Sequence, residues 1–173
     1  MRDTFISAIF GITTSIVVYK LLSVKKNKNA VCVFEGLGNI KFEQLEDGKS
    51  LVTCNLKCSD NIKPGLHGLH VHKCGDLTSG CESTCSHYNP DGNVHGGPHG
   101  KNRHRGDLGN IQILECGKCN DVFTASINVY EIIGRGLILH EDEDDLGHGG
   151  NKESQKTGNA GRRIACGVIG LVE

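Results

Sequence analysis

The sequence has little of what a helical bundle needs. Its 173 residues contain no tryptophan, and aromatic residues make up only 5%. Glycine is abundant, with 24 residues, and it punctuates many short runs of valine, isoleucine and leucine. This composition argues against a helix bundle and favours one all-β domain rich in turns, in a chain long enough for a single core.

Positive charge is scarce outside the first 29 residues. The net charge is −1, and the first 29 residues hold five of the 19 cations and one of the 20 anions. The rest of the chain therefore carries 14 cations against 19 anions, a net charge of −5. This balance excludes nucleic acid as a partner. An anionic substrate would need a local positive region to attract it.

Residues 1–29 differ from the rest of the chain. Residues 4–19 are almost continuously apolar, Lys20 interrupts them, and three lysines follow between 25 and 28. A membrane span needs about 20 apolar residues, and the A-x-A site of a cleaved signal peptide is missing. We therefore expect a membrane-associating leader outside the fold and one domain over 30–173. Because the cations follow the apolar run, the domain is expected in the cytosol; it would be secreted if the leader acts as a signal peptide.

Short runs of strand-forming residues recur along the domain. They cover residues 31–36, 39–43, 50–58, 67–72, 110–115, 122–130, 135–140 and 164–172. The pair Asp47-Gly48 indicates a hairpin between the second and third runs. Eight short strands with glycine-rich punctuation predict a sandwich or barrel. Two gaps, 73–109 and 141–163, have no strand pattern, and loops that long in a compact domain are usually functional.

Histidines gather in and beside the first gap, where seven of the nine lie between positions 67 and 104. His70 and His72 are two apart in an extended run, so both rings can face one ion. His87, His95 and His104 follow, and Asp107 comes three residues later. Imidazoles bind copper and zinc, and a carboxylate can complete a zinc site. Alone, a His-x-His pair is often accidental and loop histidines are often merely solvated; together, these six residues predict two metals.

Nine cysteines are many for a cytosolic protein and an odd number for a secreted one. Cys54-x-x-x-Cys58 and Cys116-x-x-Cys119 have the form of metal or redox pairs. Each lacks the second pair that a zinc ribbon needs, so ordinary thiols are the favoured interpretation. The sequence alone does not fix their connectivity.

Five separated motifs carry a resemblance to a known family. They are GLHGLHVHKCG (65–75), VHGGP (94–98), RHRGDLGN (103–110), LHEDEDDLGHGG (139–150) and TGNAGRRIACGVIG (157–170). In this order they closely resemble copper/zinc superoxide dismutase, colinearly over about residues 30–173. The resemblance implies an all-β, eight-stranded Greek-key β-sandwich or barrel, immunoglobulin-like, with two long functional loops. It also implies an enzyme that converts superoxide to dioxygen and hydrogen peroxide with one copper and one zinc ion per subunit.

The resemblance assigns roles to individual residues. The expected copper ligands are His70, His72, His87 and His140. The expected zinc ligands are His87, His95, His104 and Asp107, so that His87 bridges the two metals and takes up a proton during catalysis. Asp144 would link a copper histidine to a zinc histidine. Arg163 would be the active-site cation, Cys81 and Cys166 would form the disulfide, and Glu153, Lys156 and Thr157 would guide the substrate.

The resemblance also implies partners. The family usually forms a homodimer through a small apolar patch that Gly75, Ile133, Gly134, Val168 and Leu171 match. Cys74 replaces a larger apolar residue there, which weakens the expectation of a dimer. A copper chaperone is a further possible partner, and membrane association would run through residues 1–29.

Three other functions compete with the enzyme. A catalytically inactive copper-binding or chaperone-sequestering homologue typically lacks copper ligands or the arginine, which this chain keeps. A copper chaperone for the enzyme is expected to carry a separate amino-terminal domain with a Met-x-Cys-x-x-Cys loop, which this sequence does not contain. A purely structural zinc protein would leave His70, His72 and His140 unexplained. The enzyme is the favoured hypothesis, with the recognition that fold alone does not fix function.

Overall fold

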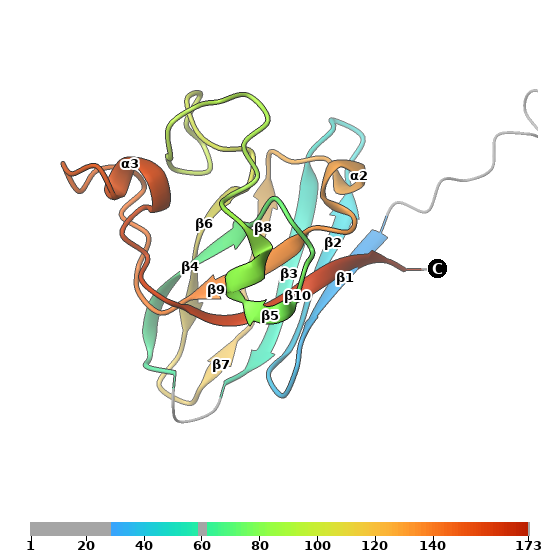
Figure 1. The fold of residues 1–173 in the computed structure, drawn as a ribbon. Coiled ribbons are helices and arrows are strands. Elements are labelled where there is room, and N and C mark those ends of the chain that lie inside the picture. Colours follow the sequence, from blue (N-terminus) through green and yellow to red (C-terminus); the bar gives the residue numbers. More distant parts are fainter. Residues whose placement is uncertain (1–28, 59–61, 173) are drawn as a thin grey trace, which may run out of the picture.

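The computed structural model describes residues 29–58 and 62–172 (Figure 1). The strands are β1 (Asn29–Phe34), β2 (Gly38–Gln44), β3 (Ser50–Lys57), β4 (Gly65–Val71), β5 (Thr78–Cys81), β6 (Asp107–Ile113), β7 (Lys118–Cys119), β8 (Val122–Ala125), β9 (Gly136–His140) and β10 (Arg163–Leu171). The helices among these residues are short: the 3-10 helix η1 (Glu82–Thr84), α2 (Val129–Ile132) and α3 (Ser154–Thr157). The leader expected over 1–29 lies outside the described residues except for Asn29, which begins β1. Within the described ranges, no helix is long and apolar enough to cross a membrane.

The strands form a nearly closed antiparallel barrel. Their order is β6-β4-β9-β10-β1-β2-β3-β7, and β8 also pairs with β3. The two end strands, β6 and β7, are joined by a tight turn in which the Leu114 amide donates to the Lys118 carbonyl at 2.9 Å. Consecutive strands β3 and β4 lie far apart in this order, which is the crossover expected of a Greek key. The predicted all-β fold class is confirmed.

Each of the eight predicted strand segments contains a strand, with one correction. The run over 122–130 ends as a strand at Ala125, and α2 begins at Val129. Asn128 caps this helix, because its side-chain oxygen accepts a hydrogen bond from the Tyr130 amide at 2.9 Å. The short strands β5 and β7 were not predicted. The hairpin at Asp47-Gly48 is present, with Gly48 at φ +83°.

Side chains alternate between the two faces of each strand. One face fills the barrel, and the other face of β4 bears histidines of the candidate site. In β1 and β2, buried residues such as Phe34, Ile40 and Phe42 alternate with more exposed ones. In β4 the last five residues are all buried. Leu69 and Val71 belong to the core, so His70 points to the other face of the sheet, together with His72 just beyond the strand. That outer face is buried because the two long loops cover it.

The two loops lie where the sequence predicts them. The first runs from β4 to β6 and contains only the short elements β5 and η1, and the second runs from β9 to β10 and contains α3. Figure 1 shows α3 and the upper part of the first loop standing beside the β4–β6 edge of the barrel. Backbone hydrogen bonds join the loops, since the His95 amide donates to the Gln155 carbonyl at 2.8 Å. The loops therefore form one cover over the outer face of β4 and β9.

Candidate metal centre

Four histidines meet on the outer face of the barrel. His70 comes from β4, His72 follows its end, His140 ends β9, and His87 belongs to the first loop, where it forms an isolated bridge with His72. The ring centroids of His70 and His87 are 4.1 Å apart, and those of His70 and His140 are 4.8 Å apart. One candidate ligand atom from each of the four lies within 4.8 Å of the others. These are the four residues expected to bind copper.

Each of these four rings has one buried nitrogen without a hydrogen-bond partner. The atoms are Nδ1 of His70 and Nε2 of His72, His87 and His140. A buried polar atom left unpaired is costly, and four that converge indicate a missing common partner. Imidazole nitrogens are good copper ligands. The donor set therefore fits a copper ion.

The opposite nitrogen of each ring is held in place. Nδ1 of His72 lies 2.9 Å from the Cys85 carbonyl oxygen, and Nδ1 of His140 lies 3.2 Å from that of Gly161. Nε2 of His70 lies 2.9 Å from Asp144 Oδ2. When these nitrogens donate, the proton is kept away from the unpartnered atom and the ring is oriented for metal binding.

The second candidate metal site surrounds Oδ1 of Asp107, the first residue of β6. Nδ1 of His87, His95 and His104 lies 2.9, 3.0 and 3.2 Å from this oxygen. The Nδ1 atoms of His87 and His104 are 3.4 Å apart. Zinc–nitrogen bonds of about 2.0–2.1 Å in a tetrahedron place neighbouring ligand atoms about 3.3 Å apart. This spacing fits a zinc ion. Nδ1 of His95 is buried and makes no aligned hydrogen bond to Asp107 or any other group, so it too is left for a metal.

His70 lies close to this second group as well. His70, His87, His95 and Asp107 also have candidate ligand atoms within 4.8 Å of one another, a set that contains His70 in place of His104. His104 fits the second group better, because its Nδ1 lies 3.2 Å from Asp107 Oδ1, whereas Nε2 of His70 faces Asp144 Oδ2 at 2.9 Å. Oδ2 of Asp107 accepts from the His104 amide at 2.9 Å, which fixes the carboxylate. His87 is the residue common to the two sites.

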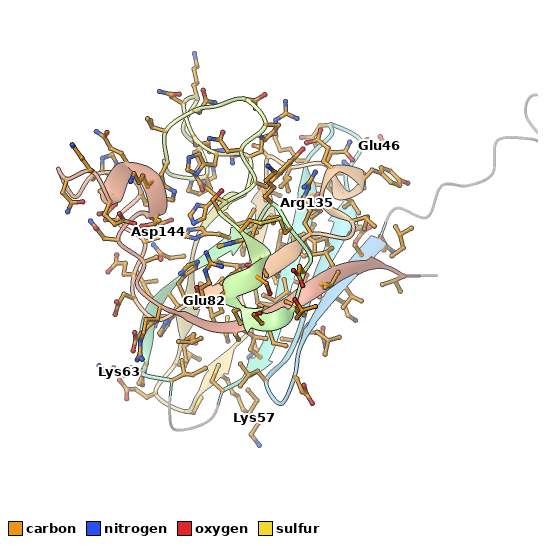
Figure 2. The ribbon with its side chains drawn as sticks, viewed as in Figure 1. Glu46, Lys57, Lys63, Glu82, Arg135 and Asp144 are labelled. Carbon is orange, nitrogen blue, oxygen red and sulfur yellow. A yellow bond between two sulfur atoms is a disulfide. The ribbon has the colours of Figure 1, made fainter. Side chains whose placement is uncertain are left out.

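Asp144 joins the two sites from behind. Its Oδ2 faces Nε2 of His70 at 2.9 Å, and its Oδ1 faces Nε2 of His95 at 2.7 Å. The residue is buried and lies in the loop between β9 and α3 (Figure 2). Asn110 of β6 holds its backbone through two hydrogen bonds of 2.7 and 2.8 Å. Its placement is the one that the resemblance implies.

Burial keeps the copper-side rings neutral. It lowers the pKa of His70 to about 3, of His72 to about 2 and of His140 to about 4. The nearby His87 ring lowers the first two pKa values further, and the pKa of His87 itself is lowered mainly by burial. Neutral imidazole is the form that binds a metal. The copper-side ligands are thus ready to bind at neutral pH.

The carboxylates have the opposite effect on the zinc side. Burial disfavours a charged His95, yet the close carboxylates of Asp107 and Asp144 outweigh it and raise the pKa of His95 to about 9. Burial also disfavours the two charged carboxylates, but their histidine partners outweigh it and lower the pKa of Asp107 and of Asp144. The zinc side therefore concentrates negative charge, which suits a divalent cation.

A cavity of about 730 Å³ leads to the copper side. It is lined by His72, His87 and His140 and, at the same place, by Arg163, the first residue of β10. One amino group of Arg163, Nη1, donates to the carbonyls of Cys81 and Glu82 and to Thr84 Oγ1, and Nη2 donates to the Cys85 carbonyl. A permanent cation is thus fixed in the cavity that His72, His87 and His140 line.

The expected guidance residues line the same cavity. Glu153 precedes α3, whereas Lys156 and Thr157 belong to it, and all three border the cavity. Thr157 Oγ1 donates to Glu153 Oε1 at 3.0 Å. Glu153 and Lys156 are exposed, so their charges act at the cavity entrance. The structure therefore brings Arg163, the expected guidance residues and the expected metal ligands to one cavity and to the two candidate metal sites at and behind it.

The cysteines divide into bonded and free groups. The structure contains the Cys81–Cys166 disulfide that the resemblance implies, and a second disulfide joins Cys74 to Cys85. The other described cysteines, which include both predicted pairs, are free: Cys32, Cys54, Cys58, Cys116 and Cys119. Cys54, Cys58 and Cys119 are buried in the hydrophobic core. This agrees with ordinary thiols rather than a zinc ribbon.

Sequence reasoning missed two supporting residues. The buried Arg103 donates to the carbonyls of His104, Arg105, Asp107 and Ser126 and so ties the zinc loop together. In the sequence it reads as a solvated loop cation. Asn110, which holds Asp144, reads as an ordinary strand residue. Neither had a signal beyond its nearness to a predicted ligand.

Comparison with known proteins agrees with this arrangement. A superoxide dismutase [Cu-Zn] of Paramecium bursaria Chlorella virus 1 is 47% identical over 159 residues, which are 88% of this chain and 83% of the viral protein. The copper chaperones for superoxide dismutase of Mus musculus and Rattus norvegicus are each 46% identical over 145 residues, or 81% of this chain. The chain spans about half of their length, 52% in each case.

A solved structure shares the fold. The crystal structure of the clock protein EA4 aligns with a TM-score of 0.80 and 41% sequence identity, covering 87% of this chain and 98% of that one. The family model described as copper/zinc superoxide dismutase matches residues 37–169, which span β2 to β10 and both long loops. The chain belongs to the copper/zinc superoxide dismutase family.

Proposed function

We propose that the protein is a superoxide dismutase, which converts two superoxide ions and two protons to dioxygen and hydrogen peroxide. The observation that carries the proposal is one cavity lined by Arg163 and by three of the four buried histidines whose unpartnered nitrogens converge, His72, His87 and His140, with His70 grouped behind them. Copper would be held by His70, His72, His87 and His140, and zinc by His87, His95, His104 and Asp107. Bound copper supplies one-electron chemistry by alternating between its +2 and +1 states.

The protein's own residues would then manage charge and protons. Arg163 attracts the anionic substrate and donates to it close to the copper side, which a preorganised guanidinium does well. His87 has Nδ1 directed to Asp107 and Nε2 to the copper side. Its Nε2, the nitrogen on the copper side, is therefore the atom that would take up a proton and pass it to the departing peroxide.

Charge at the cavity entrance would set the encounter rate. The domain is net negative, so an anion needs a local positive path. Lys156 and Arg163 provide positive charge along the cavity that leads to the copper side. Glu153 and Thr157 shape this entrance through their mutual hydrogen bond. We assign these residues to substrate guidance.

A copper-transfer role is the second candidate. The mouse and rat relatives that support it are copper chaperones for superoxide dismutase. A chaperone must release copper to a partner, whereas a dismutase must keep copper and admit superoxide repeatedly. Four buried, well-oriented histidines and a fixed arginine suit a protein that keeps copper and admits superoxide, so they favour the dismutase. An inactive copper-binding homologue would leave the placement of Arg163 without a purpose.

The proposed partners follow from the same family membership. Gly75 and Gly134 lie against each other, and a Cβ added at Gly75 would lie 3.4 Å from Val168. Val168 and Leu171 are 41% and 55% exposed, so this apolar patch is free to bury surface in a homodimer. A copper chaperone is a proposed source of the metal. We propose a cytosolic or cytosol-facing location with membrane association through residues 1–29, and secretion as the alternative.

The decisive experiment joins a superoxide-decay assay with metal analysis of the same sample of full chain. We expect about one copper and one zinc per chain from the ligand count, and rapid decay. Arg163→Ala should slow decay on the order of a hundredfold without changing the copper content. Arg162→Ala is the matched control, because Arg162 is 82% exposed and pairs with Glu141. Bound copper without superoxide decay would overturn the enzyme and favour the copper-transfer role.

A further inference from the structure

Among the described residues, the hydrogen-bond acceptors of the Arg163 guanidinium belong to one short segment. They are the carbonyls of Cys81, Glu82 and Cys85 and the hydroxyl of Thr84, at distances between 2.7 and 3.2 Å. We call residues 81–85 the arginine cradle. It consists of the end of β5, the single turn of η1 and Cys85, and Figure 2 labels Glu82 within it. The position of Arg163 therefore depends on the position of this cradle.

Each end of the cradle is tied to a different part of the site by a disulfide. Cys81 is bonded to Cys166, which lies on β10 three residues after Arg163, with Cα atoms 5.5 Å apart. Cys85 is bonded to Cys74, which lies two residues after His72, with Cα atoms 5.6 Å apart. One disulfide links the cradle to the strand that bears the arginine. The other links it to the segment that bears a copper-side histidine.

Cys85 is the point where these constraints meet. Its carbonyl oxygen accepts from Arg163 Nη2 at 2.7 Å and lies 2.9 Å from His72 Nδ1. Its φ is +67° and its ψ is −153°, a backbone conformation that a residue other than glycine seldom adopts. A residue in such a conformation keeps it only when its surroundings hold it there. The backbone bonds from Cys74 N to Thr84 O and from Lys73 N to Ser86 O, with the disulfide, provide that hold.

We propose that the Cys74–Cys85 disulfide is a positioning element that holds the Cys85 carbonyl, and through it the Arg163 guanidinium, in the substrate cavity. The proposal deepens the proposed dismutase function and rests on it. Cys74 and Cys85 act through Arg163 and do not touch the substrate. Without the disulfide, the Cys85 backbone leaves its unfavourable conformation, one acceptor of Nη2 is lost, and the guanidinium becomes mobile. The cradle is then anchored by the Cys81–Cys166 disulfide alone.

A double-mutant cycle on the copper- and zinc-loaded full chain tests this coupling. Cys74→Ala/Cys85→Ala should lower the rate constant for superoxide decay on the order of tenfold, since a small misplacement of a catalytic group has effects of that size. In the Arg163→Ala background, the same pair should have less than about a twofold effect, because the group that it positions is gone. Metal analysis should show unchanged copper. An equal loss in both backgrounds, or no loss in the first, would overturn the proposal.

Two further variants make the cycle interpretable. Cys116→Ser removes an exposed free thiol and should leave the rate unchanged, which controls for the loss of a cysteine as such. If alanine at the positive φ of residue 85 prevents folding, Cys74→Ala/Cys85→Gly replaces it, because glycine adopts this φ without strain. That pair also lacks the disulfide, and glycine leaves this conformation as readily as it adopts it, so the carbonyl at position 85 is no longer held and the same loss is expected. A rate equal to that of the original protein would overturn the proposal.

A measurement without turnover separates this inference from the dismutase proposal. Nuclear magnetic resonance of the arginine side chains should give resolved Nη–H signals for Arg163 in the zinc-loaded full chain, assigned by their loss in Arg163→Lys. These signals should disappear in Cys74→Ala/Cys85→Ala and persist in Cys116→Ser. If they persist without the disulfide, the positioning role is wrong. If the original protein shows no superoxide decay, the proposed function is wrong, and the signals still decide the positioning role.

Discussion

Replacing Asp144 with asparagine keeps the shape of the side chain and removes one of its two charged acceptor oxygens. In the structure Oδ1 faces Nε2 of His95 at 2.7 Å and also accepts from the Leu146 amide at 2.7 Å. Oδ2 faces Nε2 of His70 at 2.9 Å. An amide has one acceptor oxygen and an NH2 group that cannot accept from an imidazole N–H. At least one of the two histidines must therefore lose its partner or place its proton on the metal-facing nitrogen.

The zinc side should suffer more than the copper side. His95 lies in the glycine-rich loop before β6, and its ring is oriented by Asp144 and Asp107. His70 lies within β4, which is paired to β6 on one side and β9 on the other. A strand holds a ligand in place more rigidly than a loop does. A hydrogen bond to a charged group contributes about 1.5–3 kcal/mol, so zinc affinity should fall roughly 10- to 150-fold.

Chelator competition on the metal-free full chain measures this loss for each metal separately. Glu143→Gln is the control, because it removes a neighbouring exposed carboxylate that lies outside the site. We expect weaker zinc binding in Asp144→Asn, a smaller change for copper, and no change in the control. Unchanged affinity for zinc, or a larger loss for copper, would refute the argument that the loop ligand depends on Asp144 most.

Three more predictions concern pH, the long disulfide and salt. Removal of the metals should make stability greatest near pH 6.5. The copper-side histidines have folded pKa values of about 2 to 4, below the unfolded 6.5, so stability falls as pH drops below 6.5 by about 1.4 kcal/mol per pH unit for each extra proton bound on unfolding. His95, with a raised pKa of about 9, stabilises below 6.5 and loses that contribution as pH rises through 9; urea titrations that show a flat profile from pH 4 to 10 would contradict both. Cys166→Ser opens an 85-residue loop and should cost about 4.6 kcal/mol by chain entropy, and an unchanged urea midpoint would contradict this. Superoxide decay should slow with added salt, and less steeply in Lys156→Gln, as stopped-flow rates at several ionic strengths would show; equal slopes would remove Lys156 from guidance.

Most of the barrel could be predicted from local patterns. Alternating apolar residues and glycine turns located all eight expected strand segments, because a half-buried strand records its two faces in the sequence. The prediction of a strand through residue 130 was wrong, because Val129 and Tyr130 are strand-forming residue types that here follow a helix-capping asparagine. The strands β5 and β7 are too short to show an alternation.

The candidate metal ligands could be predicted from the sequence, but the residues that hold them in place could not. Spacing alone indicated two metals, and the family motifs separated His87 and His140 from the other histidines. Arg103 and Asn110 act through backbone carbonyls and amides that only the folded loops bring near. The Cys74–Cys85 disulfide needs the two ends of a short turn to meet, which cysteine counting does not reveal. Residue types predict metal binding, whereas tertiary contacts determine how each ligand is held.

The two metal sites differ in what holds their ligands. Three copper-side histidines stand on or beside β4 and β9, in the sheet itself, while the zinc-side histidines stand on one loop and gather around Asp107 at the start of β6. A zinc ion bound there would therefore tie the first loop to the barrel. The same loop contains the cradle of Arg163, so a zinc ion would order the arginine as well as His87. The cavity thus depends on the closed loop, and in the proposed enzyme zinc would contribute by fixing the loop rather than by reacting.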